Sequence, residues 1–315
     1  MVPVMDTLLY IGAPLDRAAH LRRDAHAMAE LFASSRRKVL PLWHELSLLD
    51  DGDSRAVVLT GTEAAMVLDL ARDVVFLGLD RDGAPMLAAD LSGAAVEPAA
   101  PEPQLGLPGR WAALRGAGPA MLREDAALMA YARAMLMWVR RTRFCGHCGA
   151  PTEPREGGQV RACLDPHCGT LHYPRTDPAV IMLVADGDRV LLHRQHGWSE
   201  GMWSILAGFV EPGETLEETV AREVREETGI VVAGATYAGC QPWPFPSSLM
   251  VGFTARAAGG TLTVCTKELE DARWFSRHEL ATLFADGHRA AGGLFLPWRG
   301  TIARRMLDDW LAAGP

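Results

Sequence analysis

Residues 208–230 read Gly-Phe-Val-Glu-Pro-Gly-Glu-Thr-Leu-Glu-Glu-Thr-Val-Ala-Arg-Glu-Val-Arg-Glu-Glu-Thr-Gly-Ile. Within this stretch, Thr215 and Glu218 have the spacing of a capping box, in which side chain and backbone satisfy each other's free groups. The apolar residues recur at i, i+4 and i+8 and form one stripe, which comprises Leu216, Val220 and Val224. Gly229 then ends the helix, because glycine tolerates a positive φ. The stretch therefore predicts a core-facing amphipathic helix between two loops.

The same helix also carries three carboxylates, in contrast to its apolar stripe. Glu223, Glu226 and Glu227 stand at i, i+3 and i+4, so they lie on one face. Like charges at this spacing repel by roughly 0.2–0.5 kcal/mol per pair, and something must compensate. Hard divalent cations bind carboxylate oxygens, and Mg²⁺ typically adds water and substrate phosphate oxygens. A solvated acidic face is the alternative, but the pattern favours a metal site that holds phosphate.

The spacing of the whole stretch resembles the Nudix box with no departure at any specified position. Gly208 is followed after five residues by Glu214, and after seven more by the Arg222-Glu223 pair that precedes the other two glutamates. The resemblance implies a loop–helix–loop that holds divalent metal against a nucleoside diphosphate linkage. It assigns Gly208, Glu214 and Arg222 a supporting role, in which arginine and glutamate brace loop and helix.

The length and the net charge of the chain restrict the number of domains and the classes of partner. At 315 residues, two or more domains are expected rather than one. The net charge of −8 argues against a dedicated nucleic-acid binder, which would be basic. It does not argue against a small nucleotide, or a nucleic acid presented end-first. No stretch approaches the ~20 apolar residues of a membrane helix, and the N-terminus lacks a basic signal region. We therefore expect no membrane partner and cytoplasmic residence.

Two cysteine pairs predict a second, structural metal. The pairs have the spacings C-x₂-C and C-x₄-C and comprise Cys145, Cys148, Cys163 and Cys168. Short knuckles of this kind supply the four thiolates of a tetrahedral Zn²⁺ site, which leaves no open catalytic position. We expect one structural Zn²⁺ per chain. The wider second knuckle leaves open whether His167 replaces a cysteine, and disulfides are the weaker explanation.

The rest of the chain supports a mixed α/β organisation. Residues 55–59 and 74–79 are expected to form strands, and residues 122–141 a helix that leads into the cysteine region. A hairpin is expected at 179–192, further strands at 230–232, 248–253 and 272–275, and helices from His278 and Thr301. The expected domains are an N-terminal α+β domain (1–121), a connecting helix (122–141), a zinc ribbon (142–175) and a catalytic domain (176–315). No internal repeat is apparent in the sequence itself.

A proline-rich stretch narrows the substrate. Gln241 to Ser248 reads Gln-Pro-Trp-Pro-Phe-Pro-Ser-Ser, in which alternate prolines favour an extended, stiff backbone. Trp243 and Phe245 would then project from it to contact flat rings or to shape a pocket. Together with the four-cysteine ribbon, the stretch resembles the marker of NADH pyrophosphatases, with Cys240 in place of the marker's leading serine.

The resemblance implies a Nudix α/β/α sandwich and a set of site residues. Glu223, Glu227 and Glu268 would be metal ligands, with Glu226 on the same face and the Ala207 carbonyl completing the sphere. Phe209 and Tyr173 would sandwich the nicotinamide, with Tyr173 coming from the second protomer of a homodimer. The remaining substrate contacts would be Gln241, Pro242, Trp243, Pro244, Phe245, Pro246, Ser247, Ser248 and Ala303.

The expected activity is metal-assisted hydrolysis of the pyrophosphate of NADH or NAD⁺, giving AMP and nicotinamide mononucleotide. Mg²⁺ and Mn²⁺ both suit the oxygen ligands. Glu227 is the expected base, with Glu226 geometrically equivalent and Glu223 beside them. NAD-capped RNA is a further expected substrate. The alternatives are another Nudix activity, on ADP-ribose or diadenosine polyphosphates, and a zinc-ribbon nucleic-acid binding protein.

Overall fold

The computed structural model describes residues 8–52, 54–93, 105–283 and 293–314. The chain divides into two compact units. The C-terminal unit comprises Met1–Leu9, Thr176–Trp243 and Ser248–Pro315, and the N-terminal unit comprises Tyr10–Arg175 and Pro244–Ser247. The finer domain boundaries expected from the sequence at 121 and 141 stay predictions.

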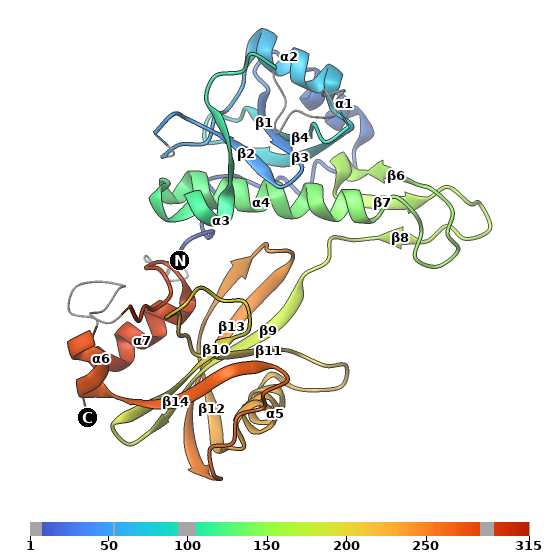
Figure 1. Ribbon diagram of the computed structural model, residues 1–315. Helices are drawn as coiled ribbons and strands as arrows, with labels where there is room; N and C mark the ends of the chain where they lie inside the picture. The colour runs from blue at the N-terminus through green and yellow to red at the C-terminus, as the bar shows by residue number, and fades with distance from the viewer. Residues whose placement is uncertain (1–7, 53, 94–104, 284–292, 315) are drawn as a thin grey trace. The chain divides into compact units, whose positions relative to one another are not determined.

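The N-terminal unit contains a five-stranded sheet with the order β3-β4-β1-β2-β5 (Figure 1). The β1–β4 pair is parallel and the β1–β2, β2–β5 and β3–β4 pairs are antiparallel. The strands are β1 (Lys38–Trp43), β2 (Leu46–Leu49), β3 (Asp73–Leu79), β4 (Pro85–Asp90) and β5 (Arg110–Ala113). The strand expected at 74–79 is confirmed as β3. The strand expected at 55–59 is wrong, because this segment makes only isolated bridges through Ala56 and Leu59.

Helices cover this sheet. Met28 from α1 and Ala64 and Val67 from α2 join Val39, Phe76 and Leu87 of the sheet in one buried cluster. Helix α4 packs against β1, β3 and β4, on the side opposite to α1 and α2 (Figure 1). The helix expected at 122–141 is thereby confirmed, and it belongs to the packing of the sheet. The helices are α1 (Ala25–Ala33), α2 (Gly61–Leu70), α3 (Leu114–Ala117), α4 (Arg123–Arg141) and two 3₁₀ turns, η1 (Gly118–Ala120) and η2 (Glu156–Gly158).

A three-stranded antiparallel sheet follows α4 within the same unit. It has the order β6-β7-β8, with β6 (Thr152–Arg155), β7 (Val160–Cys163) and β8 (Leu171–His172). Two polar contacts attach it to β3: the Gln159 amide donates to the Phe76 carbonyl at 2.7 Å, and Arg161 lies 3.4 Å from the Asp73 carboxylate. The cysteine-bearing segment is therefore fastened to the five-stranded sheet.

The C-terminal unit contains a six-stranded sheet. The order is β12-β13-β9-β10-β14, and β11 pairs with β9. The β9–β13 pair is parallel, and the other pairs are antiparallel. The strands are β9 (Asp177–Asp186), β10 (Arg189–Gln195), β11 (Leu206–Phe209), β12 (Val231–Trp243), β13 (Ser248–Gly259) and β14 (Leu269–Ser276). The hairpin and the three further strands expected from the sequence are confirmed.

The described residues of this unit also form the helices α5 (Leu216–Thr228), α6 (Arg277–Leu283) and α7 (Ile302–Ala312). Helix α5 contacts β9, β11 and β12, and α7 contacts β9, β12 and β13. They lie on opposite sides of the sheet (Figure 1), which makes an α/β/α sandwich of the expected class. Thr301 caps α7 by accepting from the Arg304 amide. No helix in the described part of the chain is long and apolar enough to cross a membrane.

The two large sheets share one topology. Strands β1, β2, β3, β4 and β5 hold the same places in the first sheet order as β9, β10, β12, β13 and β14 hold in the second. In each sheet the single parallel pair joins the first strand to the corresponding later one. The structure therefore contains a repeat of fold that is not apparent in the sequence itself.

Candidate active site and zinc site

Helix α5 forms as its sequence predicts. The Thr215 hydroxyl accepts from the Glu218 amide at 3.2 Å, and the Thr215 amide donates to the Glu218 carboxylate at 2.7 Å. Gly229 ends the helix in the left-handed region with φ 71°. A Cβ at Gly229 would lie 2.8 Å from the Thr261 carbonyl oxygen, so glycine is required for space as well as for φ. The capping box and the glycine cap are confirmed.

The carboxylates of α5 differ in environment although they share a face. Glu227 is buried, with 4% of its surface exposed. The Glu226 side chain is 52% exposed and the Glu223 side chain 12% exposed. Glu268, from the turn before β14, is exposed. Glu227 is therefore the least exposed of the four glutamates, and Glu226 and Glu268 are the most exposed.

Gly208 allows strand β11 to approach α5 closely. A Cβ at this position would lie 2.0 Å from the Glu223 carboxyl carbon, which no side chain permits. The Glu223 carboxyl therefore rests against the β11 backbone at the residue that follows Ala207. The β11 backbone beside Ala207 and the Glu223 carboxylate of α5 therefore lie close together.

The electrostatics of this cluster are unfavourable without a counter-charge. Burial, followed by the nearby Glu223 and Glu268 carboxylates, raises the pKa of Glu227 to about 8. Burial also raises the pKa of Glu223, against the opposing effect of Arg222. The Glu227 Oε2 atom is buried and has no hydrogen-bond partner among the described residues. A buried, unpartnered carboxylate oxygen among other carboxylates is the environment that a divalent cation relieves. The residues present therefore fit Mg²⁺ or Mn²⁺.

The glutamates are not drawn into a tight ligand shell. Within the described ranges, the only metal-ligand group whose donor atoms all lie within 4.8 Å of one another is the four cysteines. The charges of Glu226 and Glu268 add to the raised pKa of Glu223, and those of Glu223 and Glu268 add to the raised pKa of Glu227.

Arg222 holds the loop before α5 to the helix. It donates to both Glu214 carboxylate oxygens, at 2.6 and 2.9 Å, and to the Phe209 carbonyl at 2.9 Å. It also donates to Glu223 at 2.9 Å and Glu226 at 3.1 Å. The Arg222 guanidinium lowers the pKa of Glu214 to about 2. Because its two hydrogen bonds to Glu214 hold the guanidinium group in place, the bond from Arg222 also restricts the rotamer of Glu223.

The four cysteines of the N-terminal unit lie together. Cys145 and Cys168 Sγ atoms are 3.8 Å apart, Cys148 and Cys163 are 3.4 Å apart, and all four lie within 4.8 Å of one another. None forms a disulfide. Hydrogen bonds with Thr170 lower the pKa of Cys168 to about 6, whereas burial raises the pKa of Cys163 to about 12. His172 Nε2 lies 3.3 Å from Cys145 Sγ, whereas His167 bonds Asp165 through its backbone. The cluster suits one tetrahedral Zn²⁺.

The proline-rich stretch divides between two conformations. Gln241–Trp243 ends β12 as extended backbone, and residues 244–247 turn into β13. The expectation that the whole stretch is extended is therefore wrong at Pro244, because the chain reverses there. The Phe245 ring packs edge-on against Tyr10, with centroids 5.5 Å apart, and Arg133 lies over it at 5.2 Å.

Gln241 is fully buried and its amide is fully used. Its Nε2 donates to the carbonyls of Leu9 at 3.0 Å and Gly300 at 2.8 Å, and its Oε1 accepts from the Ile302 amide at 2.8 Å. These partners are backbone atoms from two separate segments, one at Leu9 and one at residues 300–302. The side chain thus ties the N-terminal segment and the start of α7 to β12, and in this conformation it offers no group to a substrate. The sequence gives no signal for these partners, because they are more than 50 residues away.

The other expected substrate residues are distributed over both units. Phe209 belongs to the C-terminal unit and Tyr173 to the N-terminal unit; they are 57% and 63% exposed. Ala303 is buried in the first turn of α7, and Ser248 is buried at the start of β13. Pro242 is exposed, Trp243 and Ser247 are half-buried, and Pro246 is exposed. The C-terminal unit alone brings together Ala207, Gly208, Phe209 and the glutamates.

Known proteins match all three parts of the chain. The family model described as a NUDIX domain matches residues 175–298, and an NADH pyrophosphatase zinc ribbon domain matches residues 140–173. An NADH pyrophosphatase-like rudimentary NUDIX domain matches residues 36–138. This last match agrees with the repeated sheet topology.

Curated relatives extend the match over the full length. NAD-capped RNA hydrolase NudC of Mycobacterium bovis is 38% identical over 314 residues, covering 96% of this chain and 93% of the relative. NAD-capped RNA hydrolase NUDT12 of Macaca fascicularis is 43% identical over 208 residues, covering 62% of this chain; the chain spans only 45% of that relative's length. The crystal structure of a NUDIX hydrolase from Nitrosomonas europaea is 27% identical, with TM-score 0.39, covering 44% of this chain and 80% of its own.

The sandwich, the glutamate-bearing helix and the matching domain model define a Nudix hydrolase. The full-length match narrows the assignment: this chain belongs to the NudC family. Along it lie the matches to a rudimentary NUDIX domain, a zinc ribbon and a NUDIX domain.

Proposed function

We propose that the protein hydrolyses the pyrophosphate bond of NAD(H), giving AMP and nicotinamide mononucleotide, and that it removes NAD caps from RNA 5′ ends. One observation carries the proposal: the buried Glu227 carboxylate has an unpartnered oxygen and lies beside Glu223 and Glu268. A pyrophosphate-bridging cation is the partner that such a group lacks. The NudC and NUDT12 relatives are named for hydrolysis of NAD-capped RNA, which supports this choice of substrate.

Glu223, Glu227 and Glu268 would hold Mg²⁺ or Mn²⁺, with Glu226 on the same face and the Ala207 carbonyl as a further ligand. The bound cation would neutralise the diphosphate and make water acidic enough to act near neutral pH. Arg222 positions Glu223 through the 2.9 Å hydrogen bond and is itself fixed by Glu214. Gly208 leaves the space that the Glu223 carboxyl occupies. These residues therefore prepare the site before the substrate arrives.

Glu227 is the proposed general base. Its pKa of about 8 would fall when cationic charge is bound nearby, because an opposite charge favours the ionised form. The carboxylate would then accept the proton that the attacking water loses, at the oxygen that has no other partner. Glu226 is the alternative base, since it lies one helical position away, but its oxygen is already bonded to Arg222.

Phe209 and Tyr173 are the proposed nicotinamide contacts, and their exposure suits aromatic stacking on a ligand. With Tyr173 supplied by a second protomer, the active form would be a homodimer. The four cysteines would hold one structural Zn²⁺, and we place the protein in the cytoplasm, where thiols stay reduced. Size-exclusion chromatography with light scattering would test the dimer directly.

Product analysis tests the proposal. The purified protein is incubated with NADH, NAD⁺, ADP-ribose and NAD-capped RNA, each with Mg²⁺, with Mn²⁺ and without added divalent metal. We expect AMP and reduced nicotinamide mononucleotide from NADH only when metal is present, and a 5′-monophosphate end on the decapped RNA. Faster turnover of ADP-ribose than of either NAD substrate would contradict the proposal and favour another Nudix activity.

A further inference from the structure

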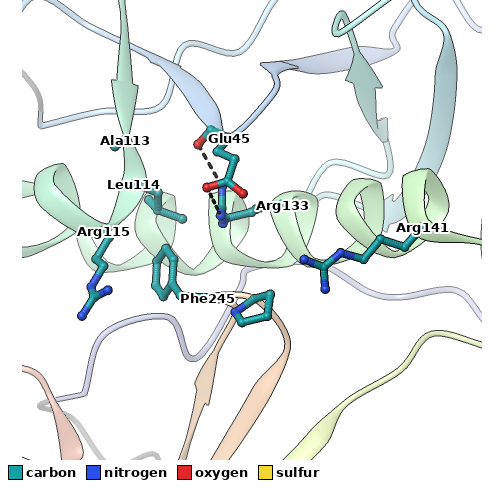
Figure 2. A pocket seen from close by; sticks show the side chains of 8 residues that line it. Glu45, Ala113, Leu114, Arg115, Arg133, Arg141 and Phe245 are labelled. Carbon is teal, nitrogen blue, oxygen red and sulfur yellow. Dashed lines mark hydrogen bonds and ion pairs between the residues drawn. The ribbon is translucent and has the colours of Figure 1, made fainter. Parts of the chain in front are cut away.

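The N-terminal unit contains a cavity of about 460 Å³, within the roughly 300–1,000 Å³ typical of small-molecule sites. Its walls come from the β1–β2 turn, the β5–α3 junction, helix α4 and the turn at 244–247. Figure 2 shows Arg115 and Arg141 on opposite sides of Phe245, with Arg133 between them and bonded to Glu45. The lining residues are Glu45, Ala113, Leu114, Arg115, Arg133, Arg141, Phe245 and Pro246.

The cavity is positively charged in a chain that is negatively charged overall. Three arginines and one glutamate line it, which leaves an excess of two positive charges, whereas the whole chain carries −8. Arg133 and Glu45 neutralise each other through a 3.1 Å ion pair. The excess therefore resides on Arg115 and Arg141.

Arg133 is a structural part of the wall. It is buried, and it donates to the Pro244 carbonyl at 3.0 Å and to the Glu45 carbonyl at 2.9 Å. These bonds fasten the turn at 244–247 to helix α4. By contrast, Arg115 and Arg141 are exposed, and neither forms a hydrogen bond or ion pair with any residue that the structure describes. Two uncommitted guanidinium groups thus border one cavity.

The chemistry of the walls selects the ligand class. Guanidinium forks match the geometry of phosphate oxygens and bind them with charge-assisted hydrogen bonds. Between the two arginines, Leu114, Phe245 and Pro246 supply apolar surface, against which a flat ring can pack. A ligand that carries a phosphate and a flat ring within one small molecule satisfies both features.

We infer that this cavity is a nucleoside phosphate subsite, in which one of the two arginines at its ends, Arg115 or Arg141, binds the phosphate and Phe245 and Pro246 contact the ring. The inference rests on the proposed function for the origin of the nucleotide, which is either the adenylate half of NAD(H) or a nucleotide that follows the cap in RNA. It also gives the rudimentary Nudix domain a role in substrate binding.

The binding test needs no turnover. AMP and adenosine are titrated calorimetrically into the full-length, zinc-loaded protein without added Mg²⁺ or Mn²⁺. Replacing both arginines (R115A with R141A) is expected to weaken AMP binding about tenfold or more, the loss expected for one charge-assisted hydrogen bond. Adenosine binding should change little. Replacing both by lysine should restore part of the AMP affinity. The matched control is Arg256→Ala, which removes an exposed arginine of β13 that does not line the cavity.

Kinetics then identify the source of the nucleotide. If it is the adenylate half of NAD(H), the double alanine variant raises KM for both NADH and NAD-capped RNA. If it is a nucleotide beyond the cap, only the KM for RNA rises, and the dependence of RNA binding on salt becomes weaker. Unchanged AMP affinity in the double variant overturns the inference even if NADH is hydrolysed. Reduced AMP affinity in a protein that hydrolyses no NAD substrate would retain the subsite and overturn the proposed function instead.

Discussion

In the N-terminal unit, helix α2 follows β2 and precedes β3, and in the C-terminal unit helix α5 holds the corresponding place between β11 and β12. Helix α5 begins with a reciprocal capping box, whereas α2 has no side-chain cap at Thr60. Of the carboxylates, α2 carries Glu63 and Asp69, and neither is buried. The helix of the C-terminal copy therefore carries a cluster of carboxylates, an arginine that holds the preceding loop and a close contact with a glycine of β11. Helix α2 of the N-terminal copy has no such cluster.

The difference shows that this fold survives the loss of its chemistry. A sheet of the same order needs only its apolar faces covered, and Val39, Phe76 and Leu87 are buried beneath helices without any charged cluster. Function resides in groups placed on the fold. In the N-terminal unit, β3 holds the cysteine-bearing sheet, and the β1–β2 turn and α4 border the arginine-lined cavity.

The largest effect is expected from loss of the zinc site, and it should affect the N-terminal unit but not the C-terminal unit. Cys145→Ser removes one of four clustered thiolates, so bound zinc should fall well below one ion per chain, because binding at such a site is coupled to folding. The sheet β6–β8 should lose protection, and so should β3, which it contacts through Gln159 and Arg161. Hydrogen exchange with mass spectrometry would measure this, and Cys240→Ser is the control. Equal loss of protection in α5 would contradict an effect confined to the N-terminal unit.

A second prediction compares the corresponding helices. Glu227→Gln should lower turnover of NADH by roughly 10²–10⁴-fold, the contribution of a positioned base. Glu63→Gln, on α2, should leave turnover within about twofold, because this side chain is exposed and distant surface changes have small effects. Steady-state assays at saturating Mg²⁺ would measure both variants. A similar loss in both would show that the N-terminal copy takes part in the chemistry.

The sequence predicts the C-terminal unit better than the N-terminal one. The helix α5 is predictable because its cap, apolar stripe and glycine stop are local signals within residues 208–230. Strand β3 is likewise predictable from its apolar run. The segment 55–59 is equally apolar, but it has no strand beside it over its whole length and forms only isolated bridges. Pairing partners, which are distant in sequence, decide that outcome.

The candidate site is predictable where spacing defines it. The relation of Arg222 to Glu214 follows from the motif, but the burial of Glu227 relative to Glu226 does not, because both share the helix face. Gln241 is the clearest difference: its sequence context indicates a substrate contact, while its three partners are backbone atoms of other segments. The arginine-lined cavity is also formed by residues from four separate segments, so no local sequence pattern predicts the cavity.

A third prediction concerns two buried glutamines, one in each unit. Gln241→Ala leaves two carbonyls and one amide without this partner and should destabilise the protein by about 3 kcal/mol. Gln159→Ala removes bonds to the Phe76 carbonyl and the Tyr131 hydroxyl and should cost less, about 1–2 kcal/mol. Urea unfolding would measure both. If Gln241 instead contacts the substrate directly, Gln241→Ala would raise KM with little loss of stability.

The smallest expected effect is a pH dependence that belongs to the C-terminal copy. The pKa of Glu227 is raised from 4.5 to about 8, so the folded state binds this proton more tightly than the unfolded state. Its contribution to stability is therefore complete below about pH 4.5 and is lost as pH rises through 8. Protons compete with the cation, so Mg²⁺ affinity should rise with pH, by at most about tenfold per unit for one proton.

Thermal unfolding at pH 6 and pH 9 would measure this dependence, with and without Mg²⁺. Without Mg²⁺, the wild-type Tm should fall more between these values than that of Glu227→Gln, which cannot titrate at this position. Burial also raises the pKa of Asp73 in the N-terminal unit, and this contribution has the same sign. Because Asp73 is unchanged in the variant, the difference between the two proteins isolates Glu227. Parallel pH profiles would mean that Glu227 is already ionised near neutral pH, and its raised pKa would then be wrong.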